Sequence, residues 1–413
     1  MTRMASTAAL DPMVGRWITD GHLADTPGVR IQGTDTYVQL PGGCCLIHYV
    51  DVRVGDAGVH AIELITGRPD GDGFTARAYE GTGEVTVMEL TALSPGVWRF
   101  TGGADVAPAA RSGEPGGDVR STLKVGDSAM TALWERDDAG AGWCPWMVVE
   151  FTRDDPGDER EAFAAAAWTT EPAADAPAEL RRLAPLAGRW RWSGRSRTSD
   201  FAVEGVTDLR WLSGGRVLAE RASLTSAGAT NESLAVTRWD PDRGACVTDY
   251  VDNDGNAGHY RIGLDGDRLT IDWPDFRFTG ALRDDLIAGT WELRESGGGW
   301  AYWYDATLSR IEHGGASTHR ERNLGGWRFA SVVDDGRVTG REPRPAGQRP
   351  WRTHLGGITH RRTDLARRGA PVRDAVRRAA SPGTRSGPGG RRALRLRGWW
   401  VAFPYLPDVA DLT

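Results

Sequence analysis

One eight-residue phrase occurs twice in the chain, with its two copies 173 positions apart. It reads LDPMVGRW at residues 10–17 and LAPLAGRW at residues 183–190. A second similarity follows: residues 134–153 align with residues 291–310 at a constant offset of 157, and three tryptophans and the final arginine recur. Repeats of this kind predict a duplicated domain, and each copy, at roughly 130 to 145 residues, has the size of one domain.

Each copy consists of short runs of alternating apolar and polar residues, separated by clusters of glycine, aspartate and proline. Residues 60–90 and 232–273 show this pattern most clearly. Several such runs in succession predict the strands of a β-sandwich or a β-barrel, because one face of each strand is buried. Helical periodicity is confined to residues 158–168 and 176–185. The sequence therefore predicts an all-β fold with short helices.

The composition divides the chain into four segments. Two β domains are expected at residues 8–153 and 180–311, joined by a linker with a short helix at 154–179. Residues 312–413 contain 20 arginines, no lysine and 9 acidic residues, and they lack sustained periodicity. Such a segment buries too little apolar area to offset chain entropy, so we expect it to be largely disordered. A solvated tail, or one translated in a shifted frame, is favoured over a nucleic-acid-binding arm.

The N-terminal residues and the apolar runs predict the cellular location, and the spacing of the cysteines predicts their state. The first residues lack the apolar core of a secretory signal, and no apolar run is long enough to cross a bilayer, so a cytoplasmic protein without a membrane partner is expected. Cys44, Cys45, Cys144 and Cys246 have no metal-ligand spacing. They are predicted to be buried free thiols, and a disulfide between Cys144 and Cys44 or Cys45 is the alternative.

The order of these features resembles that of the calycin barrels. A short helix leads into Gly-x-Trp at the first strand, antiparallel strands follow, and the last strand ends in arginine. Together with the LxGG hairpins and the FTG strands, this pattern resembles a lipocalin-like family of uncharacterised function that is related to the nitrobindin-type haem barrels. The resemblance covers residues 8–153 and 178–311. It implies two tandem lipocalin-like antiparallel β-barrels.

The resemblance also implies structural roles at the base of each barrel. In lipocalin-like barrels the Gly-x-Trp tryptophan packs at the closed end, and an arginine near the end of the last strand lies over it. The matching residues are Gly15, Trp17 and Arg153 in the first copy and Gly188, Trp190 and Arg310 in the second. The glycine pairs of the two LxGG hairpins are expected at positive φ.

The haem-binding relatives ligate iron through a histidine near the start of the last strand. The corresponding stretches here, residues 143–153 and 300–310, contain no histidine, although Tyr302 and Tyr304 are oxygen ligands in principle. A haem-binding nitrobindin-like barrel is therefore the weaker alternative. The sequence predicts no cofactor and no metal.

One titratable residue is expected inside each barrel. Side chains alternate between the interior and the exterior along each barrel strand. His48 then shares the inner face with Leu46, and Glu220 shares it with Leu218, at equivalent positions of the two copies. A titratable group among apolar walls is a candidate ligand contact or acid–base group. The structural alternatives are a hydrogen bond to a neighbouring strand and a strand face assigned the wrong way round.

Large aromatic side chains are expected to line both interiors. The chain has 18 tryptophans and only 9 phenylalanines, an excess of the larger ring. The predicted lining residues are Trp98, Phe100 and Trp134 in the first copy and Phe276, Phe278, Trp291 and Tyr304 in the second. Such walls suit a flat or polycyclic ligand, and they equally suit a barrel that is filled by its own side chains.

These features favour a binding protein for a small hydrophobic metabolite, such as an aromatic or polyene compound, held in a barrel interior. Tandem lipocalin-like enzymes suggest the alternative of a cyclase, isomerase or hydratase that uses His48 or Glu220 as a buried acid. The nucleotide-binding, zinc-protease and serine-hydrolase motifs are absent from the sequence. Nucleic acid is not expected as a partner, and no oligomeric state is predicted.

Overall fold

The structure is a computed structural model of the chain. It describes residues 2–68, 71, 73–102, 118–137, 140, 142–155 and 159–311. The predictions made for the basic segment 312–413 lie outside the described residues.

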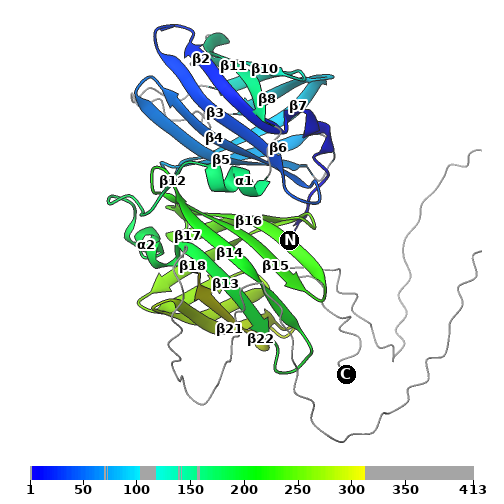
Figure 1. Cartoon of the computed structure of the whole chain (residues 1–413), viewed down its shortest axis with the longest axis vertical. Helices are drawn as coiled ribbons and strands as arrows, with labels where there is room; N and C mark the ends of the chain where they lie inside the picture. The colour runs from blue at the N-terminus through cyan, green and yellow to red at the C-terminus, as the bar shows by residue number, and fades with distance from the viewer. Residues whose placement is uncertain are drawn as a thin grey trace, which may run out of the picture. The chain divides into compact units, whose positions relative to one another are not determined.

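The first ten-stranded sheet closes into a barrel, called barrel 1 here (Figure 1). Each strand pairs antiparallel with the next one along the chain, and the last strand pairs with the first. The strands are β2 (Gly15–Leu23), β3 (Arg30–Gln39), β4 (Cys45–Val54), β5 (Ala57–Gly67), β6 (Phe74–Glu80), β7 (Val85–Ser94), β8 (Val97–Gly102), β9 (Asp118–Val125), β10 (Ala129–Asp137) and β11 (Cys144–Asp155).

The second copy forms barrel 2 in the same way, because the pairings of β13 with β22 and of β18 with β19 complete the ring. Its strands are β13 (Gly188–Arg195), β14 (Ala202–Leu212), β15 (Val217–Ser226), β16 (Ala229–Asp240), β17 (Ala245–Asp252), β18 (Asn256–Asp265), β19 (Arg268–Asp272), β20 (Phe276–Arg283), β21 (Leu286–Arg294) and β22 (Trp300–Arg310). Two short strands, β1 (Thr2–Arg3) and β12 (Trp168–Thr169), pair with β18 and β14. The predicted all-β fold with two tandem antiparallel barrels is confirmed.

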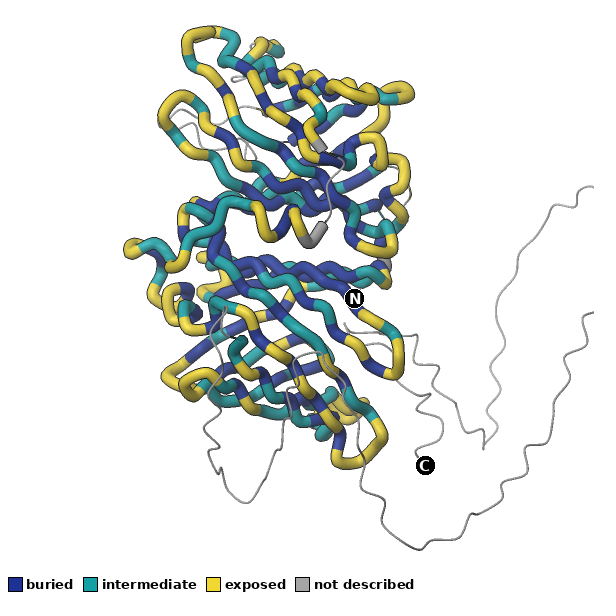
Figure 2. Tube along the Cα trace, in the orientation of Figure 1, coloured by how far each residue is buried: buried dark blue, intermediate teal, exposed yellow. Residues whose placement is uncertain are grey.

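Alternating burial along the strands builds the two interiors, as Figure 2 shows by the change from buried to exposed colours. In β2, Trp17 and Thr19 are buried, while Arg16 and Ile18 between them are exposed. The inward side chains of barrel 1 form one apolar cluster, and those of barrel 2 form another. The period of two in the sequence is thus the period of the barrel wall.

Short helices precede the first strand of each barrel. They are η1 (Ala8–Met13) before β2, and α2 (Ala178–Arg181) with η3 (Ala184–Leu186) before β13. Leu10 and Met13 of η1 are fully buried in the core of barrel 1, and Leu186 is buried in that of barrel 2. Among the described residues, no helix is long and apolar enough to cross a membrane.

Each Gly-x-Trp tryptophan ties its helix to the barrel base. The indole N–H of Trp17 donates to the Met13 carbonyl at 2.9 Å, and that of Trp190 donates to the Leu186 carbonyl at 2.8 Å. Gly15 and Gly188, which start the two strands, have φ of 140° and 131°, a conformation that favours glycine.

An arginine from the last strand covers each of these tryptophans. The guanidinium carbon of Arg153 lies 4.1 Å from the centroid of Trp17, and that of Arg310 lies 4.2 Å from the centroid of Trp190. Each guanidinium also donates to a helix carbonyl, at 3.0 Å to Pro12 and at 2.7 Å to Pro185. A cation–π contact and charge-assisted hydrogen bonds therefore join the last strand to the helix that closes each base.

The glycine pairs of the LxGG hairpins have the positive φ that the sequence predicts. Gly42 and Gly43 have φ of 93° and 64°, and Gly214 and Gly215 have φ of 105° and 67°. Side chains other than glycine rarely adopt this conformation, so these turns fix where β4 and β15 begin.

A third apolar cluster combines the outer faces of the two barrels. It includes Ile47 and Ile62 from β4 and β5, and Val217 and Leu234 from β15 and β16. Phe163 of α1 (Glu159–Ala165) joins them. The first five residues of β4 are all buried because both of its faces are covered, so simple alternation fails there.

None of the four cysteines forms a disulfide. Cys45 and Cys246 are buried, as predicted, but Cys144 is exposed and Cys44 is half-buried. The alternative disulfide to Cys144 is therefore not formed. Cys144 is the first residue of β11, where side chains at the barrel rim are less covered than those in the middle of a strand.

Candidate functional site

The interior of barrel 1 contains a series of hydrogen-bonded ionisable side chains. β3, β4 and β5 are neighbours, and their register places Tyr37 and Glu63 on either side of His48. His48 Nε2 lies 2.7 Å from an oxygen of Asp35, and its Nδ1 lies 2.9 Å from an oxygen of Glu63. One imidazole therefore joins a carboxylate on each neighbouring strand.

Thr19 and Tyr37 complete this arrangement. The Thr19 hydroxyl donates to the second carboxylate oxygen of Asp35. The Tyr37 ring stacks on the His48 ring, with 3.8 Å between centroids and 9° between planes. All of these side chains are buried except Glu63, whose side chain is 12% exposed. We call the five residues the inner network.

The inner network holds a proton on His48. Burial by itself lowers the pKa of the imidazole, but the hydrogen bonds and charges of Asp35 and Glu63 outweigh it and raise the pKa to about 9. His48 is therefore an imidazolium at neutral pH, and both of its N–H groups donate to carboxylates. With one imidazolium and two carboxylates, the inner network carries a single net negative charge.

His48 is on the inner face, but it is not a lone titratable group among apolar walls as the sequence analysis expected. It is hydrogen-bonded to both neighbouring strands, which is the structural alternative. Asp35 and Glu63 are not among the site residues predicted from the sequence. The same alternation identifies them, because Asp35 lies two residues before the inward Tyr37, and Glu63 lies two residues before the inward Ile65.

Barrel 2 places Glu220 in the equivalent position. The Thr207 hydroxyl of β14 donates to Oε1 of Glu220 at 2.6 Å, and among the described residues no other group hydrogen-bonds to this carboxyl. Burial raises the pKa of Glu220, and the Thr207 hydrogen bond opposes the shift. The side chain is half-buried, so part of its surface is not covered by protein atoms. A single hydrogen bond therefore leaves the second oxygen of Glu220 without a partner.

The two barrels form a side-chain hydrogen bond between equivalent positions, but the residue types differ. At an offset of 172, Thr207 corresponds to Asp35, and Glu220 corresponds to His48. In barrel 1 the pair is a carboxylate with an imidazolium, and in barrel 2 it is a hydroxyl with a carboxyl. Ala235 takes the position of Glu63, so barrel 2 lacks the second acid.

Aromatic side chains make up much of the barrel 2 interior, and one of them, Tyr260, lies near Glu220. Burial and then the nearby Glu220 charge raise the pKa of Tyr260 on β18. Phe278 and Trp291 lie 5.4 Å apart, and Trp291 and Tyr304 lie 6.3 Å apart, measured between ring centroids. These predicted lining residues and Phe276 all belong to the buried core of barrel 2. The interior of barrel 2 therefore combines aromatic side chains with two acidic side chains, Glu220 and the buried Asp252, which accepts a hydrogen bond from the inward Tyr250.

The predicted aromatic residues of barrel 1 also lie inside. Trp98 and Phe100 are buried in its core, while Trp134 is only half-buried and packs against that core. Trp98 meets Phe74 edge to face, with centroids 5.8 Å apart. Trp98 and Phe100 point inward, as the alternation of the strands predicts, and they belong to the same apolar cluster as Tyr37 of the inner network.

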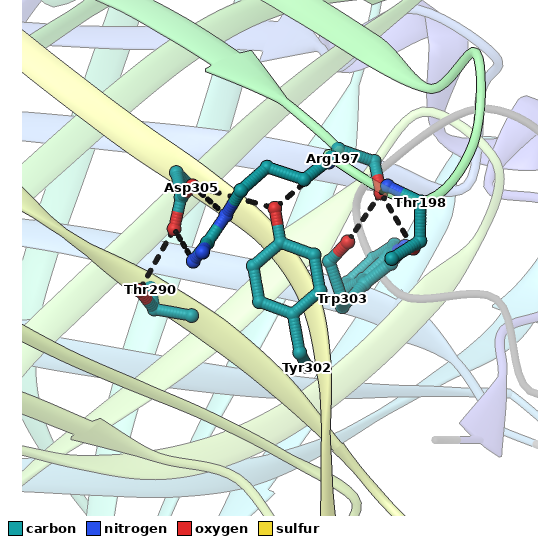
Figure 3. Close-up of polar contacts among 7 residues, drawn as sticks. Arg197, Thr198, Thr290, Tyr302, Trp303 and Asp305 are labelled. Carbon is teal, nitrogen blue, oxygen red and sulfur yellow. Dashed lines mark hydrogen bonds and ion pairs between the residues drawn. The ribbon is translucent and has the colours of Figure 1, made fainter. Parts of the chain in front are cut away.

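An ion pair and hydrogen bonds attach the loop between β13 and β14 to the outside of β22 (Figure 3). Arg197 pairs with Asp305 at 2.7 Å, and its backbone N–H donates to the Tyr302 hydroxyl at 3.0 Å. At the end of this loop, Phe201 packs against the inward Tyr304, with centroids 5.0 Å apart. Of the two tyrosines considered for haem, Tyr302 therefore belongs to an outer polar cluster, and only Tyr304 is fully buried.

A cavity of about 310 Å³ lies at the rim of barrel 2 beside α2. Its lining consists of Glu179, Arg182, Ala245, Cys246, Ile262, Gly263, Leu264, Asp265, Arg268 and Thr270. This volume is at the small end of the range for ligand pockets. None of the residues predicted to bind ligand lines it.

The described residues do not form a site for a metal ion or for haem iron. Among the described residues, no group of three or more His, Cys, Asp or Glu side chains is arranged to hold a metal ion. Haem iron needs an axial ligand, and both ring nitrogens of His48 already bind carboxylates. The inner network therefore does not fit a haem ligand.

The solved structures that are similar to this chain include two that cover about three quarters of it. One is a protein of unknown function of the DUF3598 family from Nostoc punctiforme, which is 10% identical, with 75% of this chain and 100% of that chain covered and a TM-score of 0.21. The other, provisionally described as an outer membrane protein from Bacteroides fragilis, is 8% identical, with 74% and 100% covered and a TM-score of 0.20. No family model matches the chain, and no curated protein matches its sequence.

Proposed function

We propose that the protein binds a small apolar molecule with one polar group inside barrel 2. The observation that carries this proposal is the Glu220 carboxyl, which lies within an aromatic core and has one hydrogen bond. A buried polar group without its full set of partners costs free energy, and a ligand that supplies the missing partner removes that cost. Selection acting on packing alone would favour an apolar residue at this position.

The chemistry of Glu220 defines the polar group of the ligand. Burial raises the pKa of this carboxyl, so it takes up a proton more readily than an exposed one, and the protonated form donates one hydrogen bond. Thr207 donates to one oxygen, so the O–H of the other oxygen is available. A ligand with a carbonyl or ether oxygen accepts this bond, and the aromatic walls bury its apolar body.

The test uses two naphthalenes that differ in one acceptor, 2-acetylnaphthalene and 2-ethylnaphthalene. Their dissociation constants are measured with the full chain by quenching of tryptophan fluorescence. The wild-type protein is expected to prefer the acetyl compound by about tenfold, the value of one good hydrogen bond. Glu220→Leu is expected to bind both compounds equally, and Glu220→Gln, which keeps a donor, is expected to retain the preference.

His48→Gln is the matched control, because it changes the equivalent position of barrel 1 and leaves barrel 2 intact. It is expected to bind both naphthalenes as the wild type does. If neither compound binds, or if Glu220→Leu keeps the preference for the acetyl group, the proposal is wrong. Far-UV circular dichroism of each variant shows whether the barrels remain folded.

A second candidate function is acid catalysis by the same carboxyl. The raised pKa of Glu220 and the aromatic side chains of the same interior are the specific observations. A protonated carboxyl can protonate an alkene or an epoxide, and aromatic faces stabilise the resulting cation. Cyclisation, isomerisation and hydration of an apolar intermediate share this first step. Turnover of a polyene that is abolished in Glu220→Gln, which cannot give up a proton, would favour the enzyme over the binding protein.

We also propose a calycin relationship and a cytoplasmic location. The paired tryptophan and arginine at both barrel bases support the first, since this contact is the one implied by the resemblance. The four free cysteines support the second, because disulfides are rare in the cytosol. Fractionation of cells that produce the protein at its natural level tests the location.

A further inference from the structure

Two oxygen atoms of the inner network have no hydrogen-bond partner among the described residues. The hydrogen bond between Glu63 and His48 involves only Oε2 of the carboxylate, and among the described residues no group hydrogen-bonds to Oε1. The Tyr37 hydroxyl likewise has no hydrogen-bond partner in the described part of the chain, although the residue is only 4% exposed. Neither atom is among the side-chain atoms of the described residues that are both fully enclosed and unpaired, so each keeps some accessible surface and a free position for a hydrogen bond from a ligand.

The charge of the inner network indicates the nature of that partner. Asp35 and Glu63 face one imidazolium, and the remaining group hydrogen-bonded to them, the Thr19 hydroxyl, is neutral. One negative charge is therefore left over inside an apolar core. A buried charge without a counter-ion is unfavourable, and a cation next to Glu63 would compensate it.

Apolar walls lie in the same cluster as these polar groups. Tyr37 shares the core of barrel 1 with Phe74, Trp98 and Phe100. Aromatic faces bury the apolar part of a ligand and attract a cation through their electron-rich surface. The interior therefore offers an anionic end and an aromatic lining.

Barrel 2 offers neither polar group at the equivalent places. At the offset of 172, Leu209 takes the position of Tyr37, and Ala235 takes the position of Glu63. The inner network of barrel 1 presents two acidic side chains next to one imidazolium, whereas Glu220 at the equivalent place in barrel 2 is hydrogen-bonded only to the neutral Thr207 hydroxyl among the described residues. The two interiors therefore differ in the polar group that they present to a ligand.

We propose that barrel 1 is a second binding site that selects an apolar primary amine, with the ammonium group on Glu63 and Tyr37 and the apolar body against the aromatic wall. This site does not depend on the function proposed for Glu220, because the two use different residues in different barrels.

The probes are octylamine, octanol and octanoate, titrated calorimetrically into the full-length protein at pH 7.5. Octylamine is expected to bind at least about tenfold more tightly than octanol, because only the amine brings a charge to Glu63. Octanoate is expected not to bind, since its carboxylate would add to the negative charge. Glu63→Gln, which keeps the shape of the side chain, is expected to lose about tenfold or more of the octylamine affinity.

Two further variants separate this site from the other barrel and from a folding defect. Tyr37→Phe removes only the hydroxyl and is expected to weaken octylamine binding by a few fold. Glu220→Leu is expected to bind octylamine as the wild type does, while it loses its preference among the naphthalenes. These two readouts distinguish failure of the amine site from failure of the acceptor site.

The proposal is overturned if octylamine binds no better than octanol to the wild-type protein, a comparison that requires no variant. It is equally overturned if Glu63→Gln and Tyr37→Phe bind octylamine with unchanged affinity, because the amine would then be held by acidic groups elsewhere on the chain.

Discussion

The same structural position is occupied by a basic residue, His48, in barrel 1 and by an acidic residue, Glu220, in barrel 2. His48 keeps its proton because two carboxylates accept hydrogen bonds from it, and Glu220 favours its proton because burial penalises the charged form. Both side chains thus hold a proton more tightly than they would in water, His48 through its hydrogen bonds and Glu220 through burial. The neighbours at the positions of Asp35 and Glu63 decide between these outcomes.

The inner network makes the stability of the protein depend on pH. The pKa of His48 is about 9 in the folded protein and 6.5 in its unperturbed state, so protonation stabilises the fold. The contribution is complete below pH 6.5, decreases between pH 6.5 and about 9, and is absent above that range. Its full size is at most about 3 kcal/mol.

Urea unfolding at pH 6.0, 7.5 and 9.5 measures this effect. His48→Gln is the control, because an amide cannot titrate. The wild-type protein is expected to lose stability relative to this variant as the pH rises from 6.5 to 9. Parallel stability curves for the two proteins over that range would contradict a protonated His48.

At the scale of elements, a repeated glycine lets the second strand of each barrel approach its neighbour. Gly33 in β3 and Gly205 in β14 are equivalent at the offset of 172. A side-chain carbon at Gly33 would collide with the backbone of Asp51, and one at Gly205 would collide with the backbone of Ser223. Glycine inside a strand weakens it in isolation, so its presence here marks a close backbone approach.

Gly205→Ala is therefore expected to lower the free energy of unfolding by about 1–3 kcal/mol, the usual cost of overpacking a core. Gly297→Ala is the matched control in the same barrel, because an added carbon there meets open space. It is expected to change stability by no more than about 0.5 kcal/mol. Equal effects of the two substitutions in denaturant unfolding would show that the approach of the strands imposes no constraint.

At the scale of the molecule, the apolar cluster formed by both outer walls joins the two copies. Ile47 and Ile62 of barrel 1 and Val217 and Leu234 of barrel 2 have 0% exposure within it. Large apolar surfaces of this kind couple folding units, because separating them exposes the surface to water. The duplicated domains are thus expected to behave as one cooperative unit.

We expect a single unfolding transition in urea, with coincident curves from far-UV circular dichroism and tryptophan fluorescence. Leu234→Asp places a charge in the joint cluster and is expected to separate the curves into two steps, because each barrel keeps its own interior. Two well-separated transitions in the wild-type protein would mean that the outer walls contribute little to stability.

The sequence by itself determined the duplication, the all-β class and the inward faces of the strands, because a period of two and a repeated phrase are local properties of the chain. It also pointed to His48 and Glu220. Tertiary structure alone decided that His48 meets Asp35 and Glu63, that Glu220 accepts a hydrogen bond from Thr207, and that β4 is covered on both faces. These contacts join strands whose register depends on barrel closure, and no local pattern encodes which charged groups then become neighbours.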